Sequence, residues 1–289
     1  MRSLLFVPAD GGSKLDKAFA SGADAMIIDL EDSIAPDRKA QARESAAAFL
    51  KNAASTAKRP RLLVRVNAIS TGLIDADLDA VIPARPDAIL LPKAEGAASV
   101  IHADAKLSAR EAIAGIDEGH IKILAQAIET AAGIFVAGTF NGVSARLIGM
   151  TWGPEDLSAE LGAETNRNKD GRLTEPYQLA RSLCLFGAAA ARTVAIETIY
   201  ADFRNLDGLR RDTEEARRDG FAGRLAIHPA QVAVINEVFT PTAEALAKAR
   251  ANIAAFAAAS GAGAVAIDGV MYDRPHLLHA EQVLKQTKA

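Results

Sequence analysis

Short apolar runs alternate with longer, Ala-rich helical segments along this chain, and this alternation is the feature that most constrains its fold. Eight runs resemble buried strands, because they are apolar on both faces and are separated by helical segments such as Asp37–Leu50 and Thr174–Ala191. The eight predicted strands are Ser3–Ala9, Ala25–Glu31, Arg61–Ala68, Ala88–Glu95, Lys122–Glu129, Arg146–Trp152, Thr193–Glu197 and Arg224–His228. An α/β chain with eight such units is predicted to form a closed (β/α)8 TIM barrel rather than an open doubly wound sheet. Nucleotide-binding open sheets lose support, since no Gly-x-Gly-x-x-Gly follows the first strand and no Walker-type loop is present.

Polar side chains recur at the carboxyl ends of four of these strands. Side chains two positions apart on a strand point to the same face, and each set below runs from apolar to polar along the chain. The sets are Ile27, Asp29 and Glu31; Leu63, Arg65 and Asn67; Leu91, Lys93 and Glu95; and Ala125, Ala127 and Glu129. The pattern predicts that all four sets face the barrel interior and that their polar ends form a mouth, where the active sites of such barrels lie.

Composition excludes several other classes of protein. The chain has 289 residues and a formal net charge of −3, so nothing in its bulk charge attracts it to nucleic acid or to an acidic membrane. A single cysteine, Cys184, rules out an intramolecular disulfide and a cysteine-rich zinc site. No signal peptide and no apolar run of membrane-spanning length is recognisable. We therefore expect a cytoplasmic enzyme with small-molecule substrates.

The last fifty or so residues exceed what a barrel needs. We predict a barrel domain over residues 1–240 and a helix–hairpin–helix extension over residues 241–289. The predicted elements of the extension are a helix, a hairpin and a last helix, at Ala243–Ser260, Gly261–Asp273 and Pro275–Gln286. Asp268-Gly269 is a typical two-residue hairpin turn. We expect the extension to pack on a neighbouring subunit rather than to cap its own barrel.

Glu129 and Asp156 are the candidate metal ligands. Each carboxylate lies just past an apolar run, and two hard oxygen ligands suit Mg²⁺, which keeps waters or substrate oxygens in its other positions. Each also has a structural alternative, since acidic residues are favoured at helix N-termini and Asp is a common cap. The tight turn expected at Gly153-Pro154 would aim Asp156 inward.

Arg65 is the candidate for holding a substrate carboxylate. It lies inside an otherwise apolar strand, and a buried guanidinium needs a partner. The partner is Asp29 or Glu31 on the preceding strand, or a substrate carboxylate gripped by the bidentate fork, and both can hold at once. We expect Asp29 and Glu31 to orient the groups that touch the substrate.

Two other residues offer rival chemistry. Lys93 at a strand end could form a Schiff base with a carbonyl substrate, or it could pair with Glu95 or with the acids of the second strand. His228 could be catalytic, or it could fix the loop before the helix that starts near Ala230. In both cases the structural alternative is preferred.

Taken together, the motifs resemble those of the citrate lyase β-subunit-like proteins of the HpcH/HpaI aldolase/citrate lyase superfamily, which includes malyl-CoA lyases and related thioesterases. The matching segments are Leu5–Ala9, Asp29–Ser33, Arg65–Asn67, Leu91–Glu95, Ile128–Ala131, Gly153–Leu157, Ala226–Pro229 and Gly269–Asp273. They follow one another over nearly the whole chain. By this resemblance Glu129 and Asp156 bind Mg²⁺, and Arg65 holds the oxoacid beside Glu129. Asp273 would then be an acid/base group supplied to the active site of an adjacent subunit in a homotrimer or a larger homo-oligomer.

The expected activity is therefore Mg²⁺-dependent cleavage or formation of a carbon–carbon bond in a 3-hydroxyacyl-CoA thioester, with an acyl-CoA such as acetyl-CoA and an oxoacid as the other partners. The catalytic set would be Arg65, Asp273, Glu31 and Asp29. Two alternatives stay open, namely thioester hydrolysis in the same metal site and a role as one subunit of a larger lyase complex. Nothing in the sequence names the oxoacid or the acyl group, or distinguishes CoA from a carrier protein.

Overall fold

A computed structural model describes residues 1–259, 261 and 263–285 of the chain. These residues form two compact units, Met1–Asn236 and Glu237–Ala289. The packing of the second unit on a neighbouring subunit stays a prediction. None of the described helices is long and apolar enough to cross a membrane.

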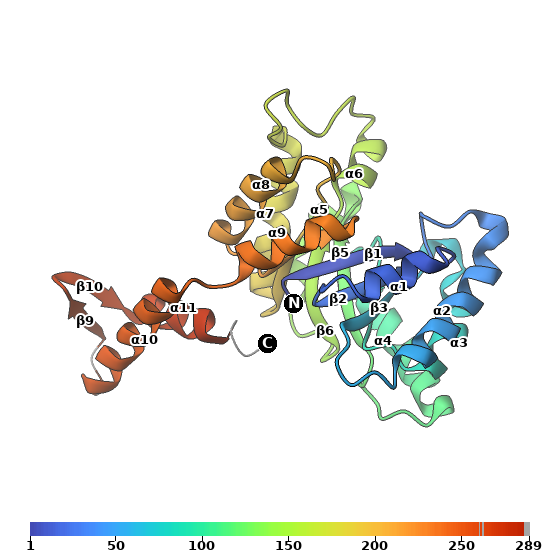
Figure 1. Cartoon of the computed structure of the whole chain (residues 1–289), viewed down its shortest axis with the longest axis horizontal. Coiled ribbons are helices and arrows are strands. Elements are labelled where there is room, and N and C mark those ends of the chain that lie inside the picture. Colours follow the sequence, from blue (N-terminus) through green and yellow to red (C-terminus); the bar gives the residue numbers. More distant parts are fainter. Residues whose placement is uncertain (260, 262, 286–289) are drawn as a thin grey trace. The chain divides into compact units, whose positions relative to one another are not determined.

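The first unit is a closed barrel of eight parallel strands that pair in chain order, with β8 returning to β1 (Figure 1). The predicted (β/α)8 barrel is confirmed, and each predicted strand is present. The strands are β1 (Ser3–Pro8), β2 (Ala25–Asp29), β3 (Arg61–Arg65), β4 (Ala88–Leu91), β5 (Lys122–Ile128), β6 (Leu147–Trp152), β7 (Val194–Glu197) and β8 (Gly223–Ala226).

Helices connect the strands and cover the outside of the barrel (Figure 1). They are α1 (Ser13–Phe19), α2 (Lys39–Ala53), α3 (Ile74–Val81), α4 (Ala97–Ala114), α5 (Ala131–Val136), α6 (Pro154–Leu161), α7 (Glu175–Ala190), α8 (Leu206–Asp219) and α9 (Pro229–Phe239). Short 3-10 turns lie at Pro36–Arg38, Ile69–Thr71, Ile82–Ala84 and Ala137–Phe140. Local sequence sets several helix ends. Proline occupies the first position of α6, and a left-handed glycine, Gly162, ends it.

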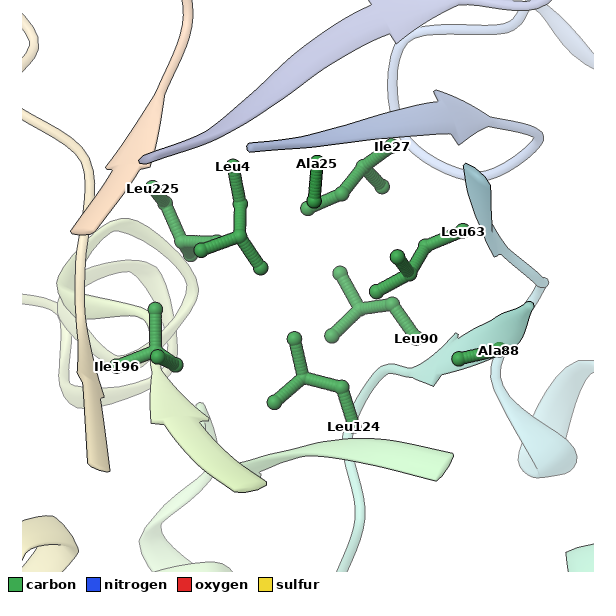
Figure 2. Close-up of a cluster of buried hydrophobic side chains, with 9 residues drawn as sticks. All are labelled: Leu4, Ala25, Ile27, Leu63, Ala88, Leu90, Leu124, Ile196 and Leu225. Carbon is green, nitrogen blue, oxygen red and sulfur yellow. The ribbon is translucent and has the colours of Figure 1, made fainter. Parts of the chain in front are cut away.

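The barrel interior is filled by apolar side chains from seven of the strands (Figure 2). They are Leu4, Ala25, Ile27, Leu63, Ala88, Leu90, Leu124, Ile196 and Leu225. For β2 and β3 this is the predicted face, because Ile27 and Leu63 point inward.

For β4 and β5 the predicted inward face is wrong. Leu90 and Leu124 point into the barrel, so their neighbours Leu91 and Ala125 face the surrounding helices. The two faces of these strands do not differ in polarity, because both are buried and apolar, so the sequence could not show which face points inward. In addition, the pairing of β5 with β6 shifts register near Gln126, so strict alternation does not extend to Glu129.

The second unit is the predicted helix–hairpin–helix. It contains α10 (Ala243–Ala258), β9 (Ala264–Ile267), β10 (Val270–Asp273) and α11 (Arg274–Lys285), and the two helices pack against each other. Asp268 and Gly269 both have positive φ, 49° and 78°, as a two-residue turn of the I′ type requires. The predicted helix ends at Ser260 and Gln286 lie outside the described residues.

Candidate active site

A cavity of about 330 Å³ opens at the carboxyl ends of the barrel strands. Much of its lining continues the barrel interior by one more step along each strand. The lining residues that lie two positions after an inward-facing core residue are Phe6, Asp29, Arg65, Gln126, Thr198 and Ile227. Gly153, Glu155 and Asp156 complete its polar side from the start of α6. The cavity is therefore the open end of the barrel core, where the sequence predicted a polar mouth.

The guanidinium of Arg65 is held by Asp29 and Glu31 and keeps N–H donors for a ligand. Its Nε and Nη2 donate to the two carboxylate oxygens of Asp29, both at 2.7 Å, and its Nη1 lies 3.0 Å from Glu31 Oε2. The guanidinium also stacks over the Phe6 ring, with its Cζ 4.8 Å from the ring centroid. A guanidinium has about five N–H donors; Asp29 takes two of them and Nη1 also faces Glu31, so Arg65 keeps donors for a ligand carboxylate in the cavity.

Asp29 and Glu31 are buried, and their environments move their pKa values in opposite directions. Burial alone would raise the pKa of Asp29, but the hydrogen bonds and charge of Arg65 outweigh it and hold that pKa below its ordinary value. For Glu31, burial outweighs the attraction of Arg65 and Lys93 and raises the pKa to about 6. Both carboxylates contact the cations of neighbouring strands, as the sequence predicted, so Asp29 and Glu31 position Arg65.

Glu129 lies just past β5 and is almost completely buried, at 1% exposed. Its Oε2 accepts a hydrogen bond of 2.7 Å from the backbone N–H of Lys93, and its Oε1 accepts one from the Gln126 side-chain amide. Burial raises the pKa of Glu129 well above its ordinary value, and the charges of Asp156 and Glu31 add to the shift. Thr130, not Glu129, caps the following helix, because its hydroxyl accepts from Gly133 N–H at 3.0 Å. The structural alternative for Glu129, an acidic residue beside a helix N-terminus that Thr130 caps, therefore remains compatible with the structure.

Asp156 lies in the first turn of α6 and faces the cavity. Gly153 is the N-cap residue of this helix, so Asp156 is not its cap. The glycine also makes room for the neighbouring carboxylate, because a Cβ at position 153 would lie 2.9 Å from Glu129 Oε1. The turn at Gly153-Pro154 thus brings the two predicted metal ligands to one side of the mouth.

Lys93 contacts two acidic side chains that follow different strands, Glu31 and Asp156. Its ammonium is 2.7 Å from Glu31 Oε1 and 3.2 Å from Asp156 Oδ1. Burial alone would lower the pKa of Lys93, but the hydrogen bond to Glu31 and the surrounding carboxylates raise it. A Schiff base requires the neutral amine, so these ion pairs favour the structural alternative for Lys93.

We call Asp29, Glu31, Arg65, Lys93, Glu129 and Asp156 the mouth cluster. Its four carboxylates and two cations leave a formal charge of −2. The described residues include no group of three His, Cys, Asp or Glu side chains that could hold a metal ion. Mg²⁺ needs only one or two carboxylates and retains several waters, so Glu129 and Asp156 fit it.

Gln126 is the site residue that the sequence reasoning missed. It is 5% exposed, lines the cavity and donates to Glu129. A signal was available, since Gln126 is the one polar residue of the apolar run Ile123–Ile128. The wrong inward face assigned to β5 placed it among the helices instead.

Two other predicted candidates, His228 and Asp273, each have a local structural contact. His228 stacks on Phe203 with ring centroids 4.8 Å apart, and its Nδ1 accepts from Ala230 N–H, so it fixes the start of α9. Asp273 belongs to the second unit, at the end of β10. There it pairs with His276, and the hydrogen bond from that ring lowers the pKa of Asp273. This contact gives the Asp273 carboxylate a local structural partner that the sequence did not reveal.

Residues 2–229 of the chain match the HpcH/HpaI aldolase/citrate lyase family. The chain belongs to this family. The predicted family is thereby confirmed, and with it the general class of carbon–carbon lyase.

Similar proteins cover essentially the whole chain. A (3S)-malyl-CoA thioesterase of Cereibacter sphaeroides is 36% identical over 100% of this chain and 95% of its own length. A citrate lyase subunit beta-like protein of Mycobacterium tuberculosis is 35% identical over 98% of this chain and 94% of its own length. The crystal structure of protein CitE from Mycobacterium tuberculosis, in complex with magnesium, acetoacetate and coenzyme A, is 33% identical. It superposes with a TM-score of 0.77 over 100% of this chain and 98% of its own.

Proposed function

We propose that this protein is a Mg²⁺-dependent carbon–carbon lyase that cleaves or forms a 3-hydroxyacyl-CoA thioester, with an acyl-CoA and an oxoacid on the other side of the reaction. The observation that carries the proposal is the cavity at the barrel mouth. Arg65 and Asp156 both line it, and the buried Glu129 contacts Gln126, another residue of the lining. A cation site and an anion-binding arginine on one small cavity suit a substrate that carries both a carboxylate and a chelating oxygen.

Arg65 orients the oxoacid half of the substrate. Asp29 fixes its guanidinium through two hydrogen bonds, and the Phe6 ring supports one face, so the group is already in place when a carboxylate arrives. Such positioning can supply several kcal/mol of a reaction barrier. Because Arg65 is buried, its interaction with a substrate carboxylate is stronger than that of an exposed arginine would be.

Glu129 and Asp156 would hold Mg²⁺, and Gln126 and the Lys93 backbone N–H keep Glu129 in place. The metal supplies Lewis-acid stabilisation of the charge that develops on the substrate's hydroxyl or ketone oxygen. Magnesium is bound in the related CitE structure, which also contains acetoacetate and coenzyme A, and this supports the same classes of ligand here.

Bond cleavage also moves a proton. In cleavage the hydroxyl gives up its proton to solvent water as the carbon–carbon bond breaks, and the carbon of the departing acyl-CoA takes one up from a protonated carboxyl group. In bond formation the corresponding carboxylate removes that proton from the acyl carbon. We assign the exchange at the acyl carbon to Asp273 of an adjacent subunit, in a homotrimer or a larger homo-oligomer. Its pKa is lowered by His276, so Asp273 is ionised at neutral pH and is suited to act as the base in the direction of bond formation.

A coupled assay tests the proposal. Purified protein with Mg²⁺ is incubated with malyl-CoA, citramalyl-CoA and citryl-CoA, and chromatography resolves acetyl-CoA from free CoA. A lyase releases acetyl-CoA together with one equivalent of oxoacid. If a folded Glu129→Ala variant cleaved the substrate at the wild-type rate in the presence of EDTA, the metal mechanism would be wrong.

Thioester hydrolysis in the same site is the second candidate, favoured by the likeness to a (3S)-malyl-CoA thioesterase. The same assay separates it, because hydrolysis releases free CoA and leaves the hydroxyacid intact.

A third candidate is a role as one subunit of a larger lyase complex, supported by the likeness to a citrate lyase subunit beta-like protein. In that case the protein alone would be inactive on all three CoA esters while still binding Mg²⁺.

A further inference from the structure

Lys93 occupies an unusual backbone position in the mouth cluster. It is not a glycine, yet its φ is +47°, in the left-handed region that costs most residues of the order of 1 kcal/mol. This conformation serves two contacts at once. The backbone N–H donates to Glu129 Oε2 at 2.7 Å, while the side chain reaches Glu31 and Asp156.

The ammonium of Lys93 is thus the cation nearest to Asp156. Its contact with Glu31, at 2.7 Å, is the shorter one, and its contact with Asp156, at 3.2 Å, is the looser one. A divalent cation held by Glu129 and Asp156 would carry the same sign of charge into the space beside this ammonium. Like charges at such separations repel appreciably where water is partly excluded.

The Lys93 side chain borders open space into which its ammonium can shift. A second cavity of about 690 Å³ is lined by Glu31, Asp32 and Lys93, and Asp32 also lines the first cavity. The Lys93 side chain is 26% exposed, so its tip is not locked by packing. The ammonium can therefore release Asp156 while it remains bound to Glu31.

We propose that the Lys93 ammonium is the resident counter-ion of the mouth carboxylates and competes with Mg²⁺ for Asp156, so that Lys93 sets how tightly the metal is held. The inference deepens the proposed function and rests on its assignment of Glu129 and Asp156 as the ligands. It makes Lys93 a positioning residue with a dual effect. The ammonium stabilises the metal-free protein and weakens the binding of the metal.

The experiment measures Mg²⁺ binding without substrate, by calorimetric titration of metal-stripped protein, together with the melting temperature in EDTA and in Mg²⁺. Lys93→Met removes the charge at similar length, and Lys93→Arg keeps it. We expect Lys93→Met to bind Mg²⁺ about tenfold more tightly than wild type, as expected for removal of one nearby like charge. Lys93→Arg should stay within about threefold of wild type. In EDTA, Lys93→Met should melt below wild type, and Mg²⁺ should raise its melting temperature by more than it raises that of wild type.

Lys106→Met is the matched control, because Lys106 pairs with Asp75 at 2.6 Å on the helices outside the barrel. It removes the same charge at a distance, so its Mg²⁺ affinity should equal that of wild type. If Lys93→Met bound Mg²⁺ as wild type does, or more weakly, the proposed competition between Lys93 and Mg²⁺ would be wrong. If Lys106→Met gained as much Mg²⁺ affinity as Lys93→Met, the gain would be an effect of net charge alone, and the proposal would also be wrong. Glu129→Gln separates the two proposals. If this variant bound Mg²⁺ as wild type does, the ligand assignment itself would fail; if it lost binding while Lys93→Met was unchanged, only the role of Lys93 would fail.

Discussion

Two buried glutamates of the barrel unit, Glu129 and Glu111, meet opposite environments. Glu111 on α4 is fully buried, and both of its oxygens accept from Arg146, at 2.8 and 2.7 Å. Backbone N–H groups of Gly119 and Ile121 add two further hydrogen bonds. Glu129 is equally buried, but its hydrogen bonds come from neutral donors, the Lys93 backbone and the Gln126 amide.

The pKa values of the two carboxyls express this difference. Burial alone would raise both, but Arg146 and the backbone donors lower the pKa of Glu111, whereas burial prevails at Glu129 and raises its pKa. The Arg146 cluster, which we define as Arg146, Asp104, Ser108 and Glu111, is internally satisfied and serves the fold. The carboxylate of Glu129 feels the charge of the nearby Lys93 ammonium, but this attraction does not offset the cost of burial. A further cation would stabilise it, which is typical of a ligand site rather than of a structural brace.

The largest effect we predict is the loss of activity in Glu129→Gln. Removing one of two metal ligands should lower kcat/KM by a factor on the order of 10³, comparable with the loss of a key electrostatic stabiliser in other enzymes. The metal-free variant should be at least as stable as wild type, because a buried charge without an ionic partner has been removed. Steady-state kinetics and thermal melting in EDTA check the two halves. A variant that lost both activity and stability would show that Glu129 is a structural brace after all.

Glu111→Gln should lose stability and keep its activity, the opposite of Glu129→Gln. Breaking a buried, hydrogen-bonded ion pair from one side typically costs about 3–5 kcal/mol of unfolding free energy. Denaturant unfolding of the variant measures this, and kcat per folded enzyme should remain within about twofold of wild type, since Glu111 lies outside the cavity lining. A fall in kcat equal to that of Glu129→Gln would contradict the division of roles.

Arg65→Lys sharpens the comparison at the substrate end. Lysine keeps the charge but loses the fork that Asp29 holds, so we expect kcat/KM to drop by roughly 10²-fold, mostly through KM for the oxoacid in the direction of bond formation. Affinity for Mg²⁺ should not change. The control is Arg65→Met, which should lose more activity than Arg65→Lys; equal activity in both would mean that Arg65 does not touch the substrate.

The smallest predicted effect is a difference in pH dependence. The pKa of Glu111 is lowered in the folded protein, so its stabilising contribution is present above the unfolded pKa of about 4.5 and disappears as pH falls through the folded value. The stability gap between wild type and Glu111→Gln should therefore be full at pH 7 and shrink below about pH 4.5. Melting temperatures between pH 3.5 and about pH 8 test this. A gap that widened on acidification would reverse the sign and refute the assignment.

Much of the mouth could be foreseen because its residues are fixed by position along single strands. Arg65 continues the inward face of β3, and Asp29 continues that of β2, so counting by twos from Leu63 and Ile27 was enough. Glu129 and Asp156 could be found because each follows a predicted strand, and the carboxyl ends of barrel strands are where active-site groups gather. The same counting failed on β5, where both faces are apolar and the register shifts near Gln126.

The amino-acid sequence by itself determined the barrel and the identity of the residues at its mouth, because eight apolar strands separated by helices have few other ways to bury both faces. The tertiary structure decided how the cations are shared among the carboxylates, and in particular that the Lys93 ammonium contacts both Glu31 and Asp156. The pairing of Arg65 with Asp29, and of Lys93 with Glu31 and Asp156, depends on side chains far apart in the chain meeting within a few ångströms. Coulomb and desolvation energies at such distances change steeply with position, and no local sequence pattern encodes them.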